Sequence, residues 1–180
     1  MSQLPLIHQI AQGRDDLAVD EKGRIMLPID KRTVLGPNFR MFQDPRGCLM
    51  LMADQMWQGF VVQIIGPVYN PLGFNALDAE VLSDCVLTNC EPVRVDPQGR
   101  LVIPQRLRAL IGNPSNVVLK GKGHVVELWS ATGLQEYDAK SDEEKETDAV
   151  KKHRAALTRF FAAPGSSQAA AAPAESAGGC

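Results

Sequence analysis

The chain has 180 residues, of which 44% are hydrophobic and 6% aromatic, enough to bury a core in one globular unit or two small ones. Its 19 basic and 21 acidic side chains give a formal charge of -2, which excludes a uniformly basic coat for nucleic acid and leaves room only for a local cluster. No stretch approaches the roughly 18 apolar residues of a membrane span, and the first thirty residues lack a secretory signal. We therefore expect a soluble, cytoplasmic protein.

One segment of the chain occurs twice. Residues 19–36 read VDEKGRIMLPIDKRTVLG, and residues 95–112 read VDPQGRLVIPQRLRALIG. Seven of these eighteen positions are identical, where ordinary residue frequencies would give about one. The similarity continues more loosely into residues 39–52 and 116–129, each with two short apolar runs around a glycine-containing turn. We expect two copies of one structural unit.

Each copy carries the same local signals in the same order. Residues 20–23 (DEKG) and 96–99 (DPQG) are tight-turn tetrapeptides, and we expect each to join two short strands into a hairpin. A proline then suits the first turn of a short helix, and a glycine suits its C-terminus. These residues are Pro28 and Gly36 in the first copy and Pro104 and Gly112 in the second. Each copy is thus predicted as strand, turn, strand, short helix, strand, turn, strand.

The segment between the copies is predicted to be helical. Asp54 can cap a helix whose apolar positions run from Met56 to Ile64, and Gly66-Pro67 is expected to end it. Residues 75–88 are expected to form a second connector helix.

After the second copy, Ser130 or Thr132 is expected to start a turn of helix, and a longer helix is expected from about Ser141. The last residues are small and polar with Pro and Gly, which predicts disorder. The predicted divisions are 10–66 (first unit with its trailing helix), 67–90 (connector), 91–140 (second unit), 141–163 (C-terminal helix) and 164–180 (disordered tail).

Charge is unevenly distributed along the chain. Residues 14–46 carry seven basic and six acidic side chains, and residues 91–128 carry six and three. Residues 53–90 carry four acidic side chains and no basic one. The two copies are therefore net positive and the connector is acidic, the pattern that a local anion-binding face leaves. Simple scatter of surface charge is an alternative.

The two turns are candidate DNA-contacting sites. Arg24 and Arg100 directly follow them, and an arginine offers a planar fork that fits phosphate oxygens or the N7 and O6 edge of guanine. Asp20 and Asp96 are expected to orient these arginines, accepting hydrogen bonds from the backbone of the turn or from the arginine itself. The alternative is that each Asp–Arg pair is a surface salt bridge that only pins its turn.

Other conspicuous side chains have weaker functional signals. Arg14 precedes the first strand and can reach a phosphate, although two aspartates follow it. Arg32 and Arg108 are expected to be solvated or to bridge to a neighbour. Trp57 and Trp129 are expected to anchor the core or a subunit contact through their large apolar area.

The motifs VDEKGRIMLPIDKR and VDPQGRLVIPQRLR, each followed by an apolar hairpin, resemble the MraZ family of bacterial regulators of the division and cell-wall gene cluster. The similarity covers roughly residues 10 to 140. It implies an α+β fold of two tandem AbrB-like, swapped-hairpin, β-barrel-type units with short helices and a connector helix. It also implies homo-oligomeric rings of about eight to twelve subunits.

In that family the Asp-x-x-x-Arg motifs form the DNA-binding face. Carried over by position, the DNA-contacting residues are Lys22 and Arg24 in the first unit and Gln98 and Arg100 in the second, with Arg14 as a further candidate. Asp20 and Gly23, and Asp96 and Gly99, are the orienting residues of the motifs.

The chain departs from the family pattern in two places. Family members carry arginines in the helix between the units, near an Asn-Pro, whereas residues 53–90 contain no Lys or Arg. Gln98 also stands where the first copy has Lys22, which suggests that the two units contribute unequally. The chain is therefore expected to be a divergent member.

The resemblance implies a sequence-specific transcriptional regulator, chiefly a repressor, that binds double-stranded promoter repeats upstream of its own division or cell-wall operon at the nucleoid. We expect no enzyme, cofactor, metal or small-molecule substrate, because the sequence has no nucleophile elbow, no Gly-rich loop opening a helix and no metal-ligand spacing. Two alternatives stay open: an AbrB-like antitoxin, and an oligomeric structural or interaction protein that does not bind DNA.

Overall fold

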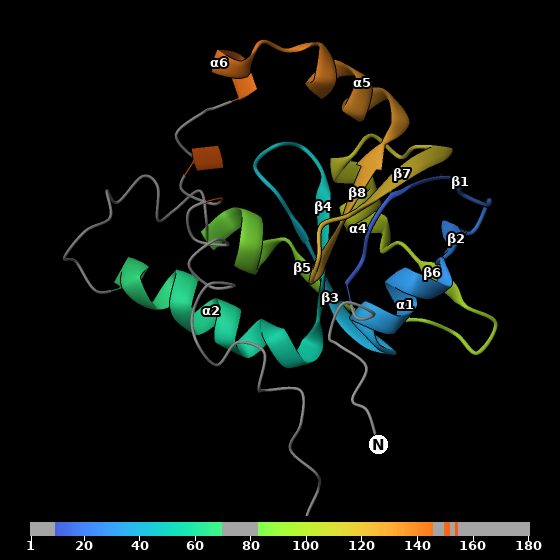
Figure 1. Cartoon of the computed structure of the whole chain (residues 1–180), viewed down its shortest axis with the longest axis horizontal. Coiled ribbons are helices and arrows are strands. Elements are labelled where there is room, and N and C mark those ends of the chain that lie inside the picture. Colours follow the sequence, from blue (N-terminus) through green and yellow to red (C-terminus); the bar gives the residue numbers. More distant parts are fainter. Residues whose placement is uncertain (1–9, 70–82, 146–149, 152–153, 155–180) are drawn as a thin grey trace, which may run out of the picture.

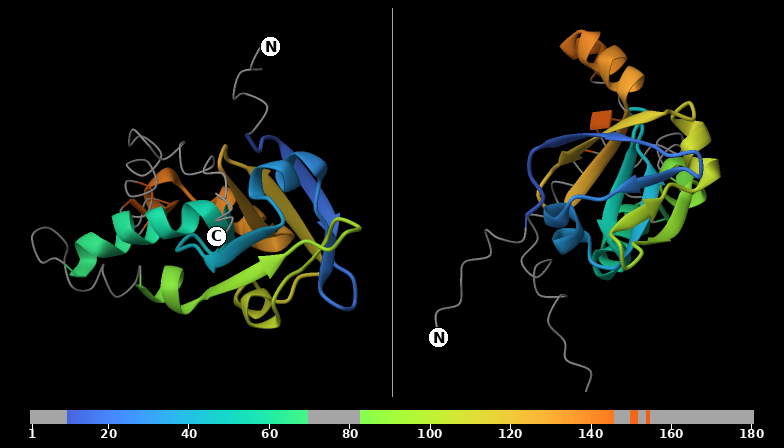
Figure 2. Two further views of the ribbon diagram at one scale, coloured as in Figure 1. Left: turned by 90° about the horizontal axis from the view of Figure 1, so that it is seen from below. Right: turned by 90° about the vertical axis from the view of Figure 1, so that its right-hand side faces the viewer.

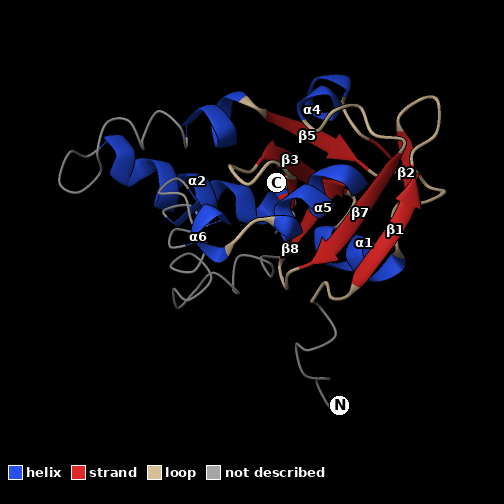
Figure 3. Ribbon diagram, turned by 90° about the horizontal axis from the view of Figure 1, so that it is seen from above, coloured by secondary structure: helices blue, strands red, loops and turns tan. Residues whose placement is uncertain are grey.

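The computed structural model describes residues 10–69 and 83–145, together with residues 150, 151 and 154. The fold is α+β, with a six-stranded sheet, a separate two-stranded ribbon and several short helices (Figure 1). Strands gather at one end of the molecule and helix α2 lies at the other, with α1 and α4 at the margins of the strand region (Figure 3). The strands and the ribbon are therefore the framework on which the repeated motifs are placed.

The six-stranded sheet is antiparallel throughout and has the order β1-β7-β8-β4-β3-β5. Its central pair, β4 and β8, joins one predicted hairpin from each copy, and the expected hairpins β3–β4 and β7–β8 are both present. The strands are β1 (Arg14–Ala18), β3 (Asn38–Gln43), β4 (Leu49–Ala53), β5 (Cys90–Arg94), β7 (Asn116–Gly121) and β8 (Val125–Ser130).

The two copies exchange their first strands. Strand β1 of the first copy pairs with β7 of the second, and β5, which precedes the second repeated segment, pairs with β3 of the first. Each edge of the sheet is therefore built by a strand from one copy lying on the hairpin of the other. Figure 2 shows β1 running along the outside of this assembly.

The prediction that each turn joins two paired strands into a hairpin holds only at the turns themselves. The N–H groups of Asp20 and Asp96 bond the carbonyls of Arg24 and Arg100 at 3.0 and 2.9 Å, and Val95 forms an isolated bridge with Leu101. For the strands that follow the turns the prediction is wrong. Strand β2 (Arg24–Met26), which follows the first turn, pairs with β6 (Arg100–Val102), which follows the second turn. The pairing is favoured because the two strands are equivalent, so that Ile25 lies opposite Leu101 and both side chains are buried. Local sequence signals place a turn, but they do not show which copy supplies the partner strand.

The short helices of the two copies are α1 (Ile29–Leu35) and α4 (Gln105–Leu110). Pro28 and Pro104 occupy the N-cap, one position before the expected first turn, and their carbonyls accept the first helical hydrogen bonds at 2.9 and 2.8 Å. Glycines follow both helices in the left-handed region, as predicted.

Helix α2 (Asp54–Tyr69) has as its first residue Asp54, which was predicted to cap it, and it does not end at Gly66-Pro67. A proline in a helix lacks its own N–H and its ring crowds the carbonyl four residues earlier. Here the proline lies within three residues of the helix end, so both effects fall on the last turns of the helix. Of the second predicted connector helix, the described part is η2 (Ser83–Thr88), a single turn with π-helical hydrogen bonding. Residues 75–82 lie outside the described residues.

Helices α5 and α6 follow the second copy within residues 131–145. Helix α5 (Ala131–Ala139) is capped by Ser130, whose Oγ accepts from the N–H of Gly133 at 3.0 Å. Helix α6 (Asp142–Lys145) starts directly after Ser141. The predicted continuation of this helix to residue 163 and the predicted tail at 164–180 lie outside the described residues, apart from residues 150, 151 and 154.

The main core lies between the sheet, the ribbon and helices α1 and α4, and equivalent residues of both copies fill it. Its buried members include Ile25, Leu27, Leu35, Leu101, Ile103 and Ile111. A second cluster holds α2 against the sheet through Phe42, Trp57 and Phe60, whose ring centroids lie 5.2 to 5.7 Å apart. Trp129 is 1% exposed and packs on Tyr137 in a third cluster. Both tryptophans therefore contribute to packing within the chain, one of the two roles expected of them.

A buried lysine distinguishes the first copy from the second. Lys31 is 2% exposed, and its Nζ lies 2.6 Å from Asp15 Oδ2 and 2.9 Å from Asp30 Oδ2, while it donates to the carbonyl of Gln12 at 2.7 Å. The equivalent position in the second copy is the apolar Leu107, which is fully buried. The copies thus keep one backbone plan while their interiors have diverged.

Candidate nucleic-acid interface

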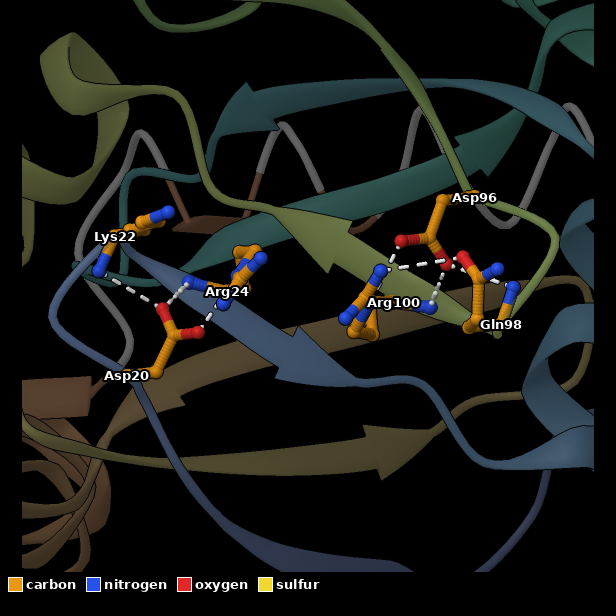
Figure 4. Close-up of polar contacts among 6 residues, drawn as sticks. All are labelled: Asp20, Lys22, Arg24, Asp96, Gln98 and Arg100. Carbon is orange, nitrogen blue, oxygen red and sulfur yellow. Dashed lines mark hydrogen bonds and ion pairs between the residues drawn. The ribbon is translucent and has the colours of Figure 1, made fainter.

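The first turn is closed by a single carboxylate. Asp20 Oδ1 accepts hydrogen bonds from the backbone N–H groups of Lys22 and Arg24, at 2.9 and 2.8 Å, and Asp20 Oδ2 accepts from Arg24 Nε at 2.6 Å (Figure 4). The backbone bond from Arg24 is the largest cause that lowers the pKa of Asp20 below its ordinary value. The carboxylate therefore stays ionised at neutral pH and fixes the direction of the arginine.

The second turn repeats this geometry. Asp96 Oδ1 accepts from the backbone N–H groups of Gln98 and Arg100, at 3.0 and 2.8 Å, and Asp96 Oδ2 accepts from Arg100 Nε at 2.7 Å. The pKa of Asp96 is lowered for the same reason, with the backbone bond from Arg100 as the largest cause. Both carboxylates thus bond to the backbone of their turns and to their arginines. The Asp–Arg salt bridge within each turn, on which the alternative interpretation rests, is therefore also present.

A glycine is required in each turn for two reasons. Gly23 and Gly99 have φ of +75° and +83°, a region that side chains with a Cβ rarely adopt. A Cβ on Gly99 would also lie 2.5 Å from the Nη1 atom of Arg32, and one on Gly23 would meet the guanidinium of Arg108. Each turn is therefore packed against an arginine from the short helix of the other copy.

The ribbon places both turn arginines on one face. Arg24 lies opposite Val102, and Met26 lies opposite Arg100. Because facing residues of an antiparallel pair point to the same side, all four side chains share a face, while Ile25 and Leu101 point to the core. The two arginines are diagonal neighbours, a relation that puts Cα atoms about 7–8 Å apart.

This face is open to solvent. Met26 is 53% exposed and Val102 is 51% exposed, and the arginine side chains are 32% and 39% exposed. Lys22 and Gln98 are exposed at the two turns that flank the strands. We call the whole surface the ribbon face, and it consists of Lys22, Arg24, Met26, Gln98, Arg100 and Val102.

Arg32 and Arg108 behave differently from the expectation that they are solvated or bridge to a neighbour. Both are half-buried, and their Nε atoms are buried without a hydrogen-bond partner among the described residues. Neither forms an ion pair with any residue in the described part of the chain. Arg32 and Arg108 occupy equivalent positions of the two copies. This repetition of an arginine is the sequence signal that could have identified them.

The structure does not bring Arg14 to the turns. Arg14 lies opposite Lys120, at the end of β1 that is farther from the first turn, and its Nη2 is 2.9 Å from Asp16 Oδ1. Both side chains of this pair are mostly exposed. A contact between Arg14 and DNA stays a prediction, and it would lie apart from the ribbon face.

Neither a metal centre nor a membrane span is indicated by the described residues. No group of three or more His, Cys, Asp or Glu in the described ranges is arranged to hold a metal ion. No helix within those ranges has the length and apolar character needed to cross a membrane. The repeated turns and their arginines are therefore the strongest candidate site in the described structure.

Comparisons with known proteins agree on one family. The family model described as "MraZ protein, putative antitoxin-like" matches residues 86–158, a range that includes the second copy. A protein of Methylibium petroleiphilum named transcriptional regulator MraZ is 30% identical over 134 residues, covering 72% of this chain and 86% of that protein.

Relatives from other bacteria carry the same name. The protein of Leuconostoc citreum is 29% identical over 125 residues, covering 69% of this chain and 84% of its own length. That of Lachnoclostridium phytofermentans is 32% identical over 112 residues, covering 62% and 75%. These identities are modest, but the alignments extend over most of each relative. The chain therefore belongs to the MraZ family, as a divergent member.

Proposed function

We propose that this protein is a DNA-binding transcriptional regulator that recognises double-stranded DNA through the ribbon face. The relatives named transcriptional regulator MraZ support the regulatory role. The observation that carries the DNA-binding part is the repeated turn geometry, in which two Asp-oriented arginines share one exposed face. Binding alone performs the function, without a catalytic step.

The dimensions of the ribbon face suit the major groove. That groove is about 12 Å wide and admits a two-stranded ribbon. The Cα atoms of the two arginines, about 7–8 Å apart as diagonal neighbours, are separated by about two base-pair steps of 3.4 Å. Each guanidinium could then bind a guanine edge or a phosphate. The exposed Met26 and Val102 occupy the other diagonal of the same face, where apolar side chains can contact thymine methyl groups.

Arg32 and Arg108 add positive charge behind the turns. Their guanidiniums lie against Gly99 and Gly23 and have no anionic partner among the described residues. A phosphate of bound DNA would supply one. With them, the basic groups at the two turns outnumber the acidic ones, which reconciles DNA binding with a chain whose formal charge is -2.

A single protomer offers few contacts, so we propose that affinity comes from assembly. Two tandem AbrB-like units, within residues 10–66 and 91–140, would form the building block of a ring of about eight to twelve subunits. Several ribbon faces on one ring would engage promoter repeats spaced near one helical turn, and avidity would multiply weak contacts. Occupying repeats upstream of its own division or cell-wall operon, at the nucleoid in the cytoplasm, would repress transcription initiation.

The test is sequence-specific binding by the intact protein. Fluorescence anisotropy should detect tighter binding to a duplex from the region upstream of its own gene than to a scrambled duplex. The Arg24→Ala, Arg100→Ala variant should lose about 30-fold or more of the affinity for the upstream duplex, because each bidentate arginine contact contributes about 1–3 kcal/mol.

The matched control removes two positive charges elsewhere. Lys122 lies in the β7–β8 turn and Lys140 follows α5, and both are exposed. The Lys122→Ala, Lys140→Ala variant should keep the affinity, and size-exclusion chromatography should give the same assembly for all three proteins. Equal affinity of the wild type and the Arg24→Ala, Arg100→Ala variant would contradict the proposal and favour an assembly that does not use this face on DNA.

A further inference from the structure

The two turns differ in how firmly they hold their arginines. In the second turn, Arg100 Nη2 donates to Gln98 Oε1 at 3.2 Å, in addition to the bond from Nε to Asp96. Two neighbours therefore hold the guanidinium at two of its nitrogen atoms, which fixes the plane of the fork as well as its direction. Figure 4 shows Gln98 and Asp96 on the same side of Arg100.

The first turn lacks this second support. Lys22 occupies the position equivalent to Gln98, and an ammonium group has no lone pair with which to accept a hydrogen bond from Arg24. Asp20 still holds Arg24 through Nε. The plane of the Arg24 guanidinium is consequently less constrained than that of Arg100.

The backbone of the second turn is also more constrained than that of the first. Pro97 occupies the second position of the second turn, where the first turn has Glu21. Proline fixes its own φ near the value that this position of a tight turn needs, so less conformational entropy is lost when the turn is ordered. The second turn is therefore more rigid in its backbone as well as in its arginine.

The charge of the two turns points to different ligands. Lys22 is exposed and ends in a compact charge on a flexible stem, which suits a phosphate that is held without strict geometry. Gln98 carries no charge, and its amide N–H groups can still donate to a base while Oε1 holds Arg100. Reading a base edge requires groups that are already oriented before binding.

We propose that the two turns divide recognition, the second turn reading base edges through Arg100 and Gln98 and the first turn anchoring the phosphate backbone through Lys22 and Arg24. This inference rests on the proposed function. If the two turns divide recognition in this way, each protomer binds its DNA repeat in one orientation. The base pairs under the second turn are then sequence-specific, and those under the first turn tolerate substitution.

The experiment exchanges the residues that differ. Binding of Lys22→Gln, Gln98→Lys and Gln98→Met to the upstream and scrambled duplexes is measured by anisotropy across a range of salt concentrations. Both substituted positions, Lys22 and Gln98, are exposed, so circular dichroism should show an unchanged fold for all three variants. Gln98→Met removes the acceptor while keeping the length of the side chain, which separates orientation from charge.

The division predicts different outcomes at the two positions. Both Gln98 variants should lower the ratio of upstream to scrambled affinity about five-fold or more. In Gln98→Lys, the slope of log affinity against log salt concentration should steepen by about one, because one more phosphate is neutralised. In Gln98→Met this slope should stay unchanged. Lys22→Gln should weaken binding to both duplexes together, with the ratio preserved and a shallower dependence on salt.

Two failures are distinguishable. If the wild type prefers the upstream duplex but Lys22→Gln lowers the ratio as much as the Gln98 variants do, the division of recognition is wrong while the proposed function stands. If the wild type shows no preference between the duplexes, the proposed function itself fails, and the division fails with it.

Discussion

Gly99 illustrates how one residue can serve both the fold and the site. Its positive φ requires glycine, and the guanidinium of Arg32 occupies the space where a Cβ would lie. Gly112 has nearly the same φ, +82°, but apart from its two chain neighbours no atom of the described residues lies within 4 Å of the place its Cβ would take. Both positions therefore need a positive φ, but only Gly99 also needs space for Arg32. A comparison of substitutions at the two positions isolates the effect of the contact with Arg32.

We predict that Gly99→Ala and Gly112→Ala lose similar stability but differ in DNA binding. Each should lower the free energy of unfolding by about 1–2 kcal/mol, the cost of a left-handed residue with a Cβ, since the flexible tip of Arg32 can move aside. Only Gly99→Ala should weaken binding to the upstream duplex, because it displaces Arg32. Urea denaturation and anisotropy measure the two effects, and equal loss of binding in both variants would refute the role of this contact.

At the scale of residues, the sequence predicted the turn chemistry well. Asp at the first position, Gly at the fourth and Arg directly after them are local features, and the expected bonds from backbone and arginine to the carboxylates are present. The position of Arg32 and Arg108 could not be predicted, because each lies on a turn of the other copy, more than sixty residues away in the chain.

The ribbon is the element on which the candidate site depends. Its two strands have three residues each, and their inner residues, Ile25 and Leu101, are 2% and 0% exposed. The outer residue Val102 is 51% exposed. The ribbon is therefore held by its inner face and leaves its outer face free for a ligand.

We predict opposite consequences for two neighbouring substitutions in β6. Leu101→Ala should lower the free energy of unfolding by about 2–5 kcal/mol, because it opens a cavity in a packed core. Val102→Ala should change stability by about 0.5 kcal/mol or less, as expected for a surface position, yet weaken binding to the upstream duplex. A Val102→Ala variant that is strongly destabilised, with unchanged DNA binding, would show that the outer face packs against protein instead.

At the scale of elements, the sequence predicted the strands, the short helices and their order within each copy. It failed where the outcome depends on partners distant in the chain. The turns were expected to join paired strands, whereas β2 pairs with β6 and β1 with β7. Helix α2 passes Pro67 because the missing donor and the crowded carbonyl of a proline affect only the last turns when the proline lies this close to the helix end.

In the whole molecule, the two copies are interleaved. Each edge strand of the sheet lies on the hairpin of the other copy, and the ribbon takes one strand from each. This arrangement explains why the two motifs, 76 positions apart in the sequence, share one face. The repeat predicted two equivalent units, but self-similarity alone did not predict that the units would exchange strands.

In the proposed complex, the arginines of both turns contact the same DNA together. The most direct test is the salt dependence of binding to the upstream duplex, measured for the wild type and for the Arg24→Ala, Arg100→Ala variant. Neutralised phosphates release counterions, so the logarithm of the affinity should fall steeply with the logarithm of salt concentration for the wild type, and the slope should flatten in the variant. Absence of binding at low salt, or an identical slope in both proteins, would show that the two arginines do not contact DNA together.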